Sequence, residues 1–193
     1  MKSNIIVING HPDPQSFCAA LSDAYIEGAS ASKAQVRSID VSKITVNPNL
    51  QFGYRKRTEL EEDLVESQKL IQWADHLVFV YPTWWGVMPA ILKGFIDRVF
   101  LPGFAYQYRK NSSMVEKLLT GKSAHLIVTL DTPSWYNKLV YKNAGHHVMK
   151  RNILKFCGVS PVRVTDLGPI RGSSDKLRAQ WLVKVNQLGS KLA

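Results

Sequence analysis

Five short apolar segments alternate along the chain with longer amphipathic ones. Most of the apolar segments are nearly continuous runs, such as residues 5–8, and such runs are typical of strands buried on both faces of a sheet. The segment at 34–40 alternates weakly and is also expected to be a strand. The five predicted strands lie at residues 4–9, 34–40, 76–81, 124–130 and 162–167.

Between these strands, apolar residues recur at helical spacing. Ser16 can cap a helix that begins at Phe17, and Pro89 suits the first position of another helix. Residues 41–58 show no period and residues 102–113 are rich in aromatic side chains, so both segments are predicted to be loops. Helices are expected from residue 17, at 59–73, at 89–100, from a turn at 131–136 to residue 156, and at 175–192.

The alternation of strand and helix predicts an α/β fold with a parallel sheet covered on both faces. Five such units in 193 residues match the flavodoxin-like doubly wound arrangement, a five-stranded parallel sheet of order 2-1-3-4-5. The length fits a single domain over residues 1–193. Ligands of such sheets bind outside the carboxyl ends of the strands, where the strand order reverses. We therefore expect a site between the first and third strands, framed by the loops at 10–16 and 82–88.

Composition narrows the class of protein. Hydrophobic residues make up 45% and charged residues 21%, which excludes disordered, collagen-like and coiled-coil chains. No apolar stretch approaches the roughly 20 residues that span a bilayer, and the N-terminus lacks the features of a signal peptide, so we expect a cytoplasmic protein. Cys18 and Cys157 have no metal-ligand spacing; we expect two buried hydrophobic residues and no metal site.

The net charge of +10 favours anionic ligands such as phosphorylated cofactors, nucleic acid or an acidic membrane face. The basic residues are scattered, with short clusters only at 54–57 and 150–151. No nucleic-acid-binding motif is present, so nucleic acid is not an expected partner.

The first loop, residues 10–17, has the sequence GHPDPQSF. Ser16 opens a helix, where free backbone N–H groups and the helix dipole favour an anion, and the Ser16 hydroxyl and the His11 imidazole add donors. A phosphate is the natural ligand; the alternative is an ordinary capped turn. The loop is neither a Walker loop nor a GxGxxG fingerprint, which disfavours a Rossmann-type NAD site.

The second loop, residues 81–89, has the sequence YPTWWGVMP. Two adjacent tryptophans in a loop, Trp84 and Trp85, suggest that at least one faces a cavity. A flat aromatic surface with nearby backbone amides suits an isoalloxazine ring, whose reduced anionic form such amides stabilise. The alternative is a hydrophobic plug over the edge of the sheet.

These segments resemble the NAD(P)H:quinone oxidoreductases of the DT-diaphorase and modulator-of-drug-activity type. The resemblance covers nearly the whole chain and is most specific at residues 89–100. The similar segments are NGHP at 9–12, SF at 16–17, YPTWWGVMPAILKGFIDRVF at 81–100, GFAYQY at 103–108 and FCG at 156–158.

The resemblance implies a homodimer with a flavin at the carboxyl edge of the sheet, FAD being favoured over FMN. It implies a two-electron ping-pong reaction, in which hydride passes from NAD(P)H through flavin N5 to a quinone or similar acceptor. The acceptor would contact Trp85 and, from the partner subunit, Tyr106 and Tyr108; local loop packing is the alternative for these tyrosines. The implied cofactor-binding residues are His11, Ser16, Phe17, Cys18, Pro82, Thr83, Trp84, Trp85, Gly86, Leu130, Asp131 and Thr132.

One segment departs from the family pattern. The fourth strand of the family usually ends in Thr-Thr-Gly-Gly, whereas residues 129–136 here read TLDTPSWY, and Pro133 lacks one N–H donor. The mammalian enzymes carry a tyrosine and a histidine after this turn, implied to handle charge during hydride transfer. Tyr136 corresponds to the tyrosine, and His146 or His147 could be the histidine, although the spacing does not match; Tyr136 and His146 are taken as the catalytic candidates. A position on the helix surface is the alternative for His146 and for His147.

Two other functions fit parts of the pattern. Some relatives are ancillary regulatory subunits of glutathione-gated potassium efflux systems, which makes a membrane transporter a candidate partner for the basic cluster at 55–57. A one-electron flavodoxin carrier is the third reading, but such carriers are typically acidic and the charge of +10 opposes it.

Overall fold

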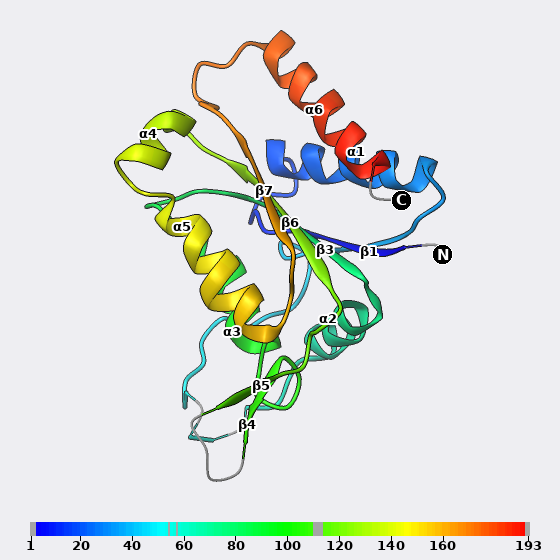
Figure 1. Ribbon diagram of the computed structural model, residues 1–193, viewed down its shortest axis with the longest axis vertical. Coiled ribbons are helices and arrows are strands. Elements are labelled where there is room, and N and C mark those ends of the chain that lie inside the picture. The colour runs from blue at the N-terminus through cyan, green and yellow to red at the C-terminus, as the bar shows by residue number, and fades with distance from the viewer. Residues whose placement is uncertain (1–2, 54, 57, 110–113, 192–193) are drawn as a thin grey trace.

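A five-stranded parallel sheet forms the centre of the protein, in a computed structural model that describes residues 3–53, 55–56, 58–109 and 114–191 (Figure 1). Its strand order is β2-β1-β3-β6-β7, and all neighbours are parallel. The strands are β1 (Asn4–Asn9), β2 (Gln35–Asp40), β3 (His76–Pro82), β6 (Ser123–Thr129) and β7 (Val162–Leu167). The predicted order 2-1-3-4-5 is confirmed, because β6 and β7 are the fourth and fifth strands expected from the sequence.

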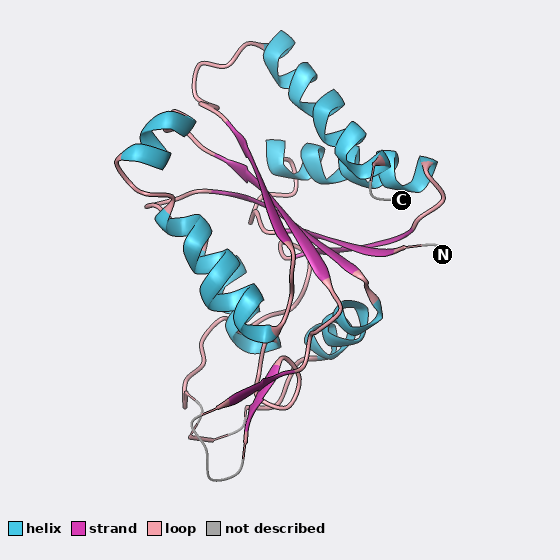
Figure 2. Ribbon diagram, viewed as in Figure 1, coloured by secondary structure: helices cyan, strands magenta, loops and turns pink. Residues whose placement is uncertain are grey.

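Helices cover both faces of the sheet (Figure 2). One face carries α1 (Phe17–Ala31) and α6 (Asp175–Ser190), and the other carries α2 (Glu62–Trp73), α3 (Ala90–Val99) and α5 (Ala144–His147). Each face buries its own apolar cluster: Leu21 and Val185 belong to the first, Leu64 and Phe95 to the second. The continuous apolar strands are explained by this burial on both sides.

The prediction that residues 102–113 form only a loop is wrong. β4 (Tyr106–Tyr108) pairs antiparallel with β5 (Val115–Lys117), and this hairpin projects away from the sheet, beyond α2 and α3 (Figure 1). Strands of three residues are too short for an alternating pattern to be recognised in the sequence.

Helix α2 begins three residues later than the predicted start at residue 59. The fully buried guanidinium of Arg98 donates to the carbonyl oxygen of Glu59 at 2.8 Å and to the carboxylate of Glu61 at 2.8 and 3.2 Å. These contacts hold the segment extended, with Glu61 at φ −61° and ψ 152°. A long-range contact therefore overrides local helix propensity.

The predicted helix after residue 136 is interrupted. α4 (Ser134–Leu139) ends before Lys142 and Asn143, whose φ values of 50° and 54° are left-handed, and α5 then continues into the π-helix η1 (Val148–Lys155). Asn143 accepts a hydrogen bond from the Asn137 side chain at 3.3 Å. Asparagine tolerates the left-handed conformation and offers the backbone an alternative to helix, which explains the break.

Smaller differences lie at element ends. Pro89 is the N-cap of α3, one residue before its first helical position, and α6 ends at Ser190. Where the structure describes residues 41–58, they contain no helix or strand, as predicted. Two residues of the basic cluster at 54–57, Tyr54 and Arg57, lie outside the described residues. Leu192, the predicted end of the last helix, also lies outside them. No helix within the described ranges is long and apolar enough to cross a bilayer.

Candidate functional site

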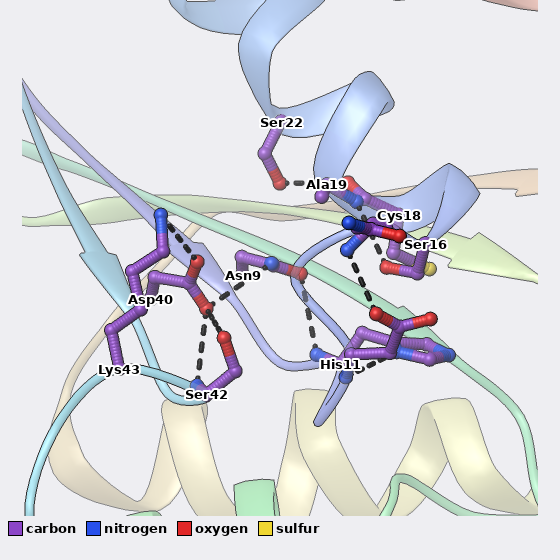
Figure 3. Close-up of polar contacts among 11 residues, drawn as sticks. Asn9, His11, Ser16, Cys18, Ala19, Ser22, Asp40, Ser42 and Lys43 are labelled. Carbon is purple, nitrogen blue, oxygen red and sulfur yellow. Dashed lines mark hydrogen bonds and ion pairs between the residues drawn. The ribbon is translucent and has the colours of Figure 1, made fainter.

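The first loop of the site begins at a buried polar residue at the end of β1. The Asn9 side chain, 5% exposed, donates to Asp40 Oδ1 at 3.3 Å and accepts from the backbone N–H of His11 at 3.2 Å (Figure 3). Asp40 Oδ1 in turn accepts from the Ser42 hydroxyl at 2.7 Å. Asn9 thus fixes the start of the loop relative to two neighbouring strands.

The amino end of α1 closes this loop. The Ser16 side chain accepts from the backbone N–H of Ala19 at 3.2 Å, so the serine is the predicted N-cap (Figure 3). Throughout the described residues, the N–H groups of Phe17 and Cys18 have no hydrogen-bond acceptor, and the first turn carries no acidic side chain. Two free N–H groups, the Ser16 O–H and the positive end of the helix dipole together suit a phosphate.

His11 adds a directed donor. Its Nδ1 accepts from the backbone N–H of Asp13 at 2.9 Å, so in the neutral ring the proton is on Nε2. The ring also contacts Trp84 edge-on, with centroids 5.4 Å apart. This contact joins the first loop to the second.

The second loop is a tight turn. Trp84 and Val87 exchange backbone hydrogen bonds of 2.8 and 3.1 Å, and Trp85 and Gly86 between them have φ values of 51° and 82°. This strained turn leaves Trp85 fully exposed at 102%, while Trp84 is 45% exposed. A Cβ atom on Gly145 of α5 would overlap the carbonyl oxygen of Gly86, so the helix packs directly on the turn.

Two adjoining pockets lie where the loops after β1, β3 and β6 meet. One has a volume of about 330 Å³ and the other about 480 Å³, and Thr83, Leu130 and Asp131 line both. All twelve predicted cofactor-binding residues line one or both pockets. Of the twelve, the first pocket is lined by His11, Ser16, Phe17, Cys18, Pro82, Thr83, Trp84, Leu130 and Asp131. The second pocket is lined by Thr83, Trp85, Gly86, Leu130, Asp131 and Thr132.

The third loop of the site follows β6 and has the sequence LDTP at residues 130–133, in place of the glycine pair that is usual in the family. Asp131 Oδ1 accepts from the backbone N–H of Arg171 at 2.8 Å, which ties this loop to the one after β7. The N–H groups of Asp131 and Thr132 have no acceptor in the described part of the chain, nor do those of Trp85 and Gly86. Two loops that line the second pocket therefore carry N–H groups without an acceptor, which fits the polar edge of a flavin ring.

The predicted substrate and catalytic residues are less closely gathered. Tyr106 is buried against Phe156, with ring centroids 5.0 Å apart, whereas Tyr108 is 64% exposed. Neither lines the two pockets of its own chain, and their hairpin lies far from the loops (Figure 1). Tyr136 does not line the second pocket itself. Its ring packs against that of Tyr141, which does, with ring centroids 5.3 Å apart.

His146 is not on the helix surface, and that alternative is wrong for this residue. It is 8% exposed; its Nε2 lies 2.9 Å from Asp166 Oδ1 and 3.4 Å from Asn137 Nδ2. Asn137 lines the second pocket, so His146 reaches the pocket only through this amide. His147 is exposed, as expected of a helix-surface residue.

Both cysteines are buried, as predicted. Burial raises the pKa of the Cys18 thiol to about 11, partly offset by a contact of 3.5 Å with Thr129 Oγ1. Burial likewise raises the pKa of Cys157 to about 11. Both thiols are therefore protonated at neutral pH, and Cys18 offers the pocket a backbone N–H rather than a thiolate nucleophile.

Sequence reasoning did not name Asn9 as a site residue, and it missed the pocket-lining residues Asp13, Thr129, Asn137, Tyr141, Ala144, Gly145 and Ile170. A polar residue ending an apolar run, followed by a glycine, was a usable signal for Asn9. Asn137 and Ile170 enter through the interrupted helix and through the loop after β7, and no local pattern marks either.

Comparison with known proteins places the chain in a family. Residues 3–188 match the sequence model of a protein family that is described as having a flavodoxin-like fold. A solved protein of Streptococcus mutans UA159 is 40% identical, with a TM-score of 0.84 over 99% of this chain and 100% of that one. An uncharacterized NAD(P)H oxidoreductase of Haemophilus influenzae is 29% identical over 91% of this chain and 88% of its own length. The human ribosyldihydronicotinamide dehydrogenase [quinone] is 27% identical over 80% of this chain and 76% of its own.

The structural likeness extends to an NAD(P)H:quinone oxidoreductase of Methanothermobacter marburgensis. Its TM-score is 0.86 over the full length of both chains, and at 24% identity it supports the fold. The two named relatives are thus oxidoreductases, one named for NAD(P)H and the other for ribosyldihydronicotinamide and quinone. The chain belongs to the flavodoxin-like family that these proteins share, and it is an oxidoreductase.

Proposed function

We propose that this chain is a flavin-dependent NAD(P)H:quinone oxidoreductase that transfers two electrons, as hydride, to a quinone or similar acceptor. The observation that carries the proposal is the pair of adjoining pockets at the carboxyl edge of the sheet. One offers free helix N–H groups for a phosphate, and the other offers an exposed indole and loop N–H groups for a flat ring. The names of the relatives support the same chemistry.

The residues present fit a flavin. The N–H groups of Phe17 and Cys18, the Ser16 hydroxyl and His11 Nε2 would hold the phosphate, and the loop at 83–86 would hold the ring. Bound there, a flavin supplies the two-electron chemistry between nicotinamide and acceptor. The chain orients the reactants and supplies N–H donors, and the protonated Cys18 thiol does not compete as a nucleophile.

We place the acceptor against Trp85 in the second pocket, whose other walls include Asn137 and Tyr141. The proposal includes a homodimer, in which the exposed Tyr108 of one subunit closes the pocket of the other and excludes water. Tyr106, buried against Phe156, would position this wall rather than touch the acceptor. Tyr136 and His146 are proposed to act from behind the pocket, through Tyr141 and Asn137.

FAD is proposed in preference to FMN, on the resemblance of residues 89–108 to the diaphorase branch, and the proposed location is the cytoplasm. An absorption spectrum of the purified protein, before and after anaerobic NADPH, tests the function. We expect a yellow protein that NADPH bleaches and a quinone recolours, and chromatography of the released cofactor separates FAD from FMN. A colourless protein that neither flavin reconstitutes would overturn the proposal and favour the regulatory subunit, which pelleting with transporter-containing membranes would then test.

A matched pair of variants tests the phosphate site. Ser16→Glu places negative charge at the amino end of α1 and should expel the flavin. Ser174 caps α6 in the same way, with its side chain accepting from the Leu177 N–H at 3.3 Å, and it lines neither pocket. Ser174→Glu should therefore retain flavin. Equal flavin content in both variants would remove the first loop from the site.

A further inference from the structure

A basic pocket lies on the edge strand β7, away from the flavin pockets. It has a volume of about 450 Å³. Its basic lining residues come from three elements: Lys150 of η1, Arg163 of β7 and Lys191 at the end of α6. None of its lining residues is acidic. Within the described ranges, none of these three cations has an ion-pair partner. Three positive charges around one hollow attract an anion.

The inner wall of this pocket is a buried histidine. His125 of β6 is 2% exposed and pairs in the sheet with Arg163; its Nε2 lies 2.8 Å from Thr165 Oγ1. Its Nδ1 is fully buried and has no hydrogen-bond partner in the described part of the structure. One buried polar atom of the histidine that lines the pocket therefore has no partner among the described residues.

The surroundings of His125 disfavour its charged form. Burial and the charge of Arg163 lower the pKa of His125 to about 4. Burial, His125 and Arg163 lower the pKa of His76 to about 4 as well, and Arg163 acts also on the buried Tyr25. Among the described residues, the other charged side chains that line the pocket are those of Lys150 and Lys191. An anion beside Arg163 would offset the contribution of that charge.

We propose that this pocket binds a phosphate group, held by Arg163, Lys150 and Lys191. Arginine presents a planar set of donors that suits phosphate oxygens, and the two lysines add charge from either side of the strand. The pocket is a second site, because His125 precedes Thr129 of the first flavin pocket by four residues along β6, or about 13 Å at a strand rise of ~3.3 Å per residue. The inference does not depend on the proposed function.

Phosphate could reach this pocket as a small solute or as a lipid headgroup, and the experiment separates the two. The flavin-loaded protein is titrated with inorganic phosphate at low ionic strength, and NMR follows the His125 ring and the Arg163 side chain. We expect saturable shifts at both residues and a rise in the pKa of His125. Pelleting with phosphatidylcholine vesicles containing phosphatidylglycerol tests the headgroup. Competition by inorganic phosphate would show that vesicle binding uses the same pocket.

Substitutions at exposed positions test the pocket without disturbing the core. Arg163→Gln combined with Lys191→Gln should weaken phosphate binding at least tenfold. Lys184→Gln makes the same charge change on an exposed position of α6 outside the pocket and should change the affinity less than twofold. If the double variant binds phosphate with the affinity of the parent, the proposal is wrong. If its only change is a greater tendency to aggregate, the cations protect the edge strand from pairing with another chain, and the proposal is also wrong.

Two further outcomes are decisive. Non-saturable shifts at His125, equal to those at unrelated lysines, would overturn the proposal. A chain that binds phosphate at His125 but takes up no flavin would contradict the proposed function alone.

Discussion

Two buried histidines should make the stability of this protein fall steeply in mild acid. His76 and His125 are 5% and 2% exposed, and their pKa values are lowered from 6.5 to about 4, chiefly by burial. In the unfolded chain both titrate near 6.5. Between pH 6.5 and 4 the unfolded state therefore binds more protons than the folded state, so the free energy of unfolding decreases as the pH falls through this window and is unaffected by these groups above it.

The magnitude follows from the pKa values. Each pH unit in this window changes the stability by about 1.4 kcal/mol per histidine, so lowering the pH from 6.5 to 5 removes about 2 kcal/mol for each, or about 4 kcal/mol together. This is a large part of the roughly 5–15 kcal/mol by which a domain is usually stable.

Urea denaturation at pH 7.5 and pH 5, in buffer without phosphate, measures the effect. In the His76→Gln/His125→Gln double variant, glutamine does not titrate, so the loss between the two pH values should be smaller than in the parent by about 4 kcal/mol. His147→Gln, at an exposed position of α5, should leave the parent's pH dependence unchanged. If the double variant loses as much stability as the parent, the buried histidines do not control acid sensitivity and the reasoning fails.

Three further changes test other contacts. Gly145→Ala adds a Cβ that overlaps a carbonyl oxygen in the loop after β3, so flavin titration of the apoprotein should show an affinity at least tenfold weaker. Arg98→Leu leaves the carboxylate of Glu61 without its buried partner and should lower the free energy of unfolding in urea by about 3 kcal/mol. Ser16→Ala and Ser174→Ala each remove a helix cap and should each cost about 1 kcal/mol in the same assay, but only the first should also weaken flavin binding.

The sheet was predictable because its signal is local. Five apolar runs, each followed by an amphipathic segment, leave few arrangements other than a doubly wound sheet, and its order locates the site at the loops after the first and third strands. The two loops predicted to bind a cofactor do meet there, at Thr83, with the loop after β6. Strand position and topology therefore predicted which loops meet, whereas the twelve residues expected to bind a cofactor were implied by the resemblance; all twelve line the two pockets at this meeting point.

The features that sequence reasoning missed depend on contacts between distant residues. Arg98 lies 37 positions from Glu61, yet it decides where α2 begins. Asp166 lies on the last strand and draws His146 into the interior, which no helical pattern around His146 could indicate. The β4–β5 hairpin depends on pairing across residues 106–117, and each strand alone is too short to be recognised.

The distribution of charge changes how the net charge of +10 is interpreted. No lysine or arginine is among the described residues that line the two candidate flavin pockets, where the charged side chains are Asp13 and Asp131. A phosphate in the first pocket would depend on the helix N–H groups of Phe17 and Cys18, which sit in a fixed backbone and lose little entropy on binding. Three cations, Arg163, Lys150 and Lys191, instead line the pocket at the edge strand. The excess positive charge therefore does not argue for NADPH over NADH at the flavin site, and its effect should appear as phosphate binding at the opposite end of the strands.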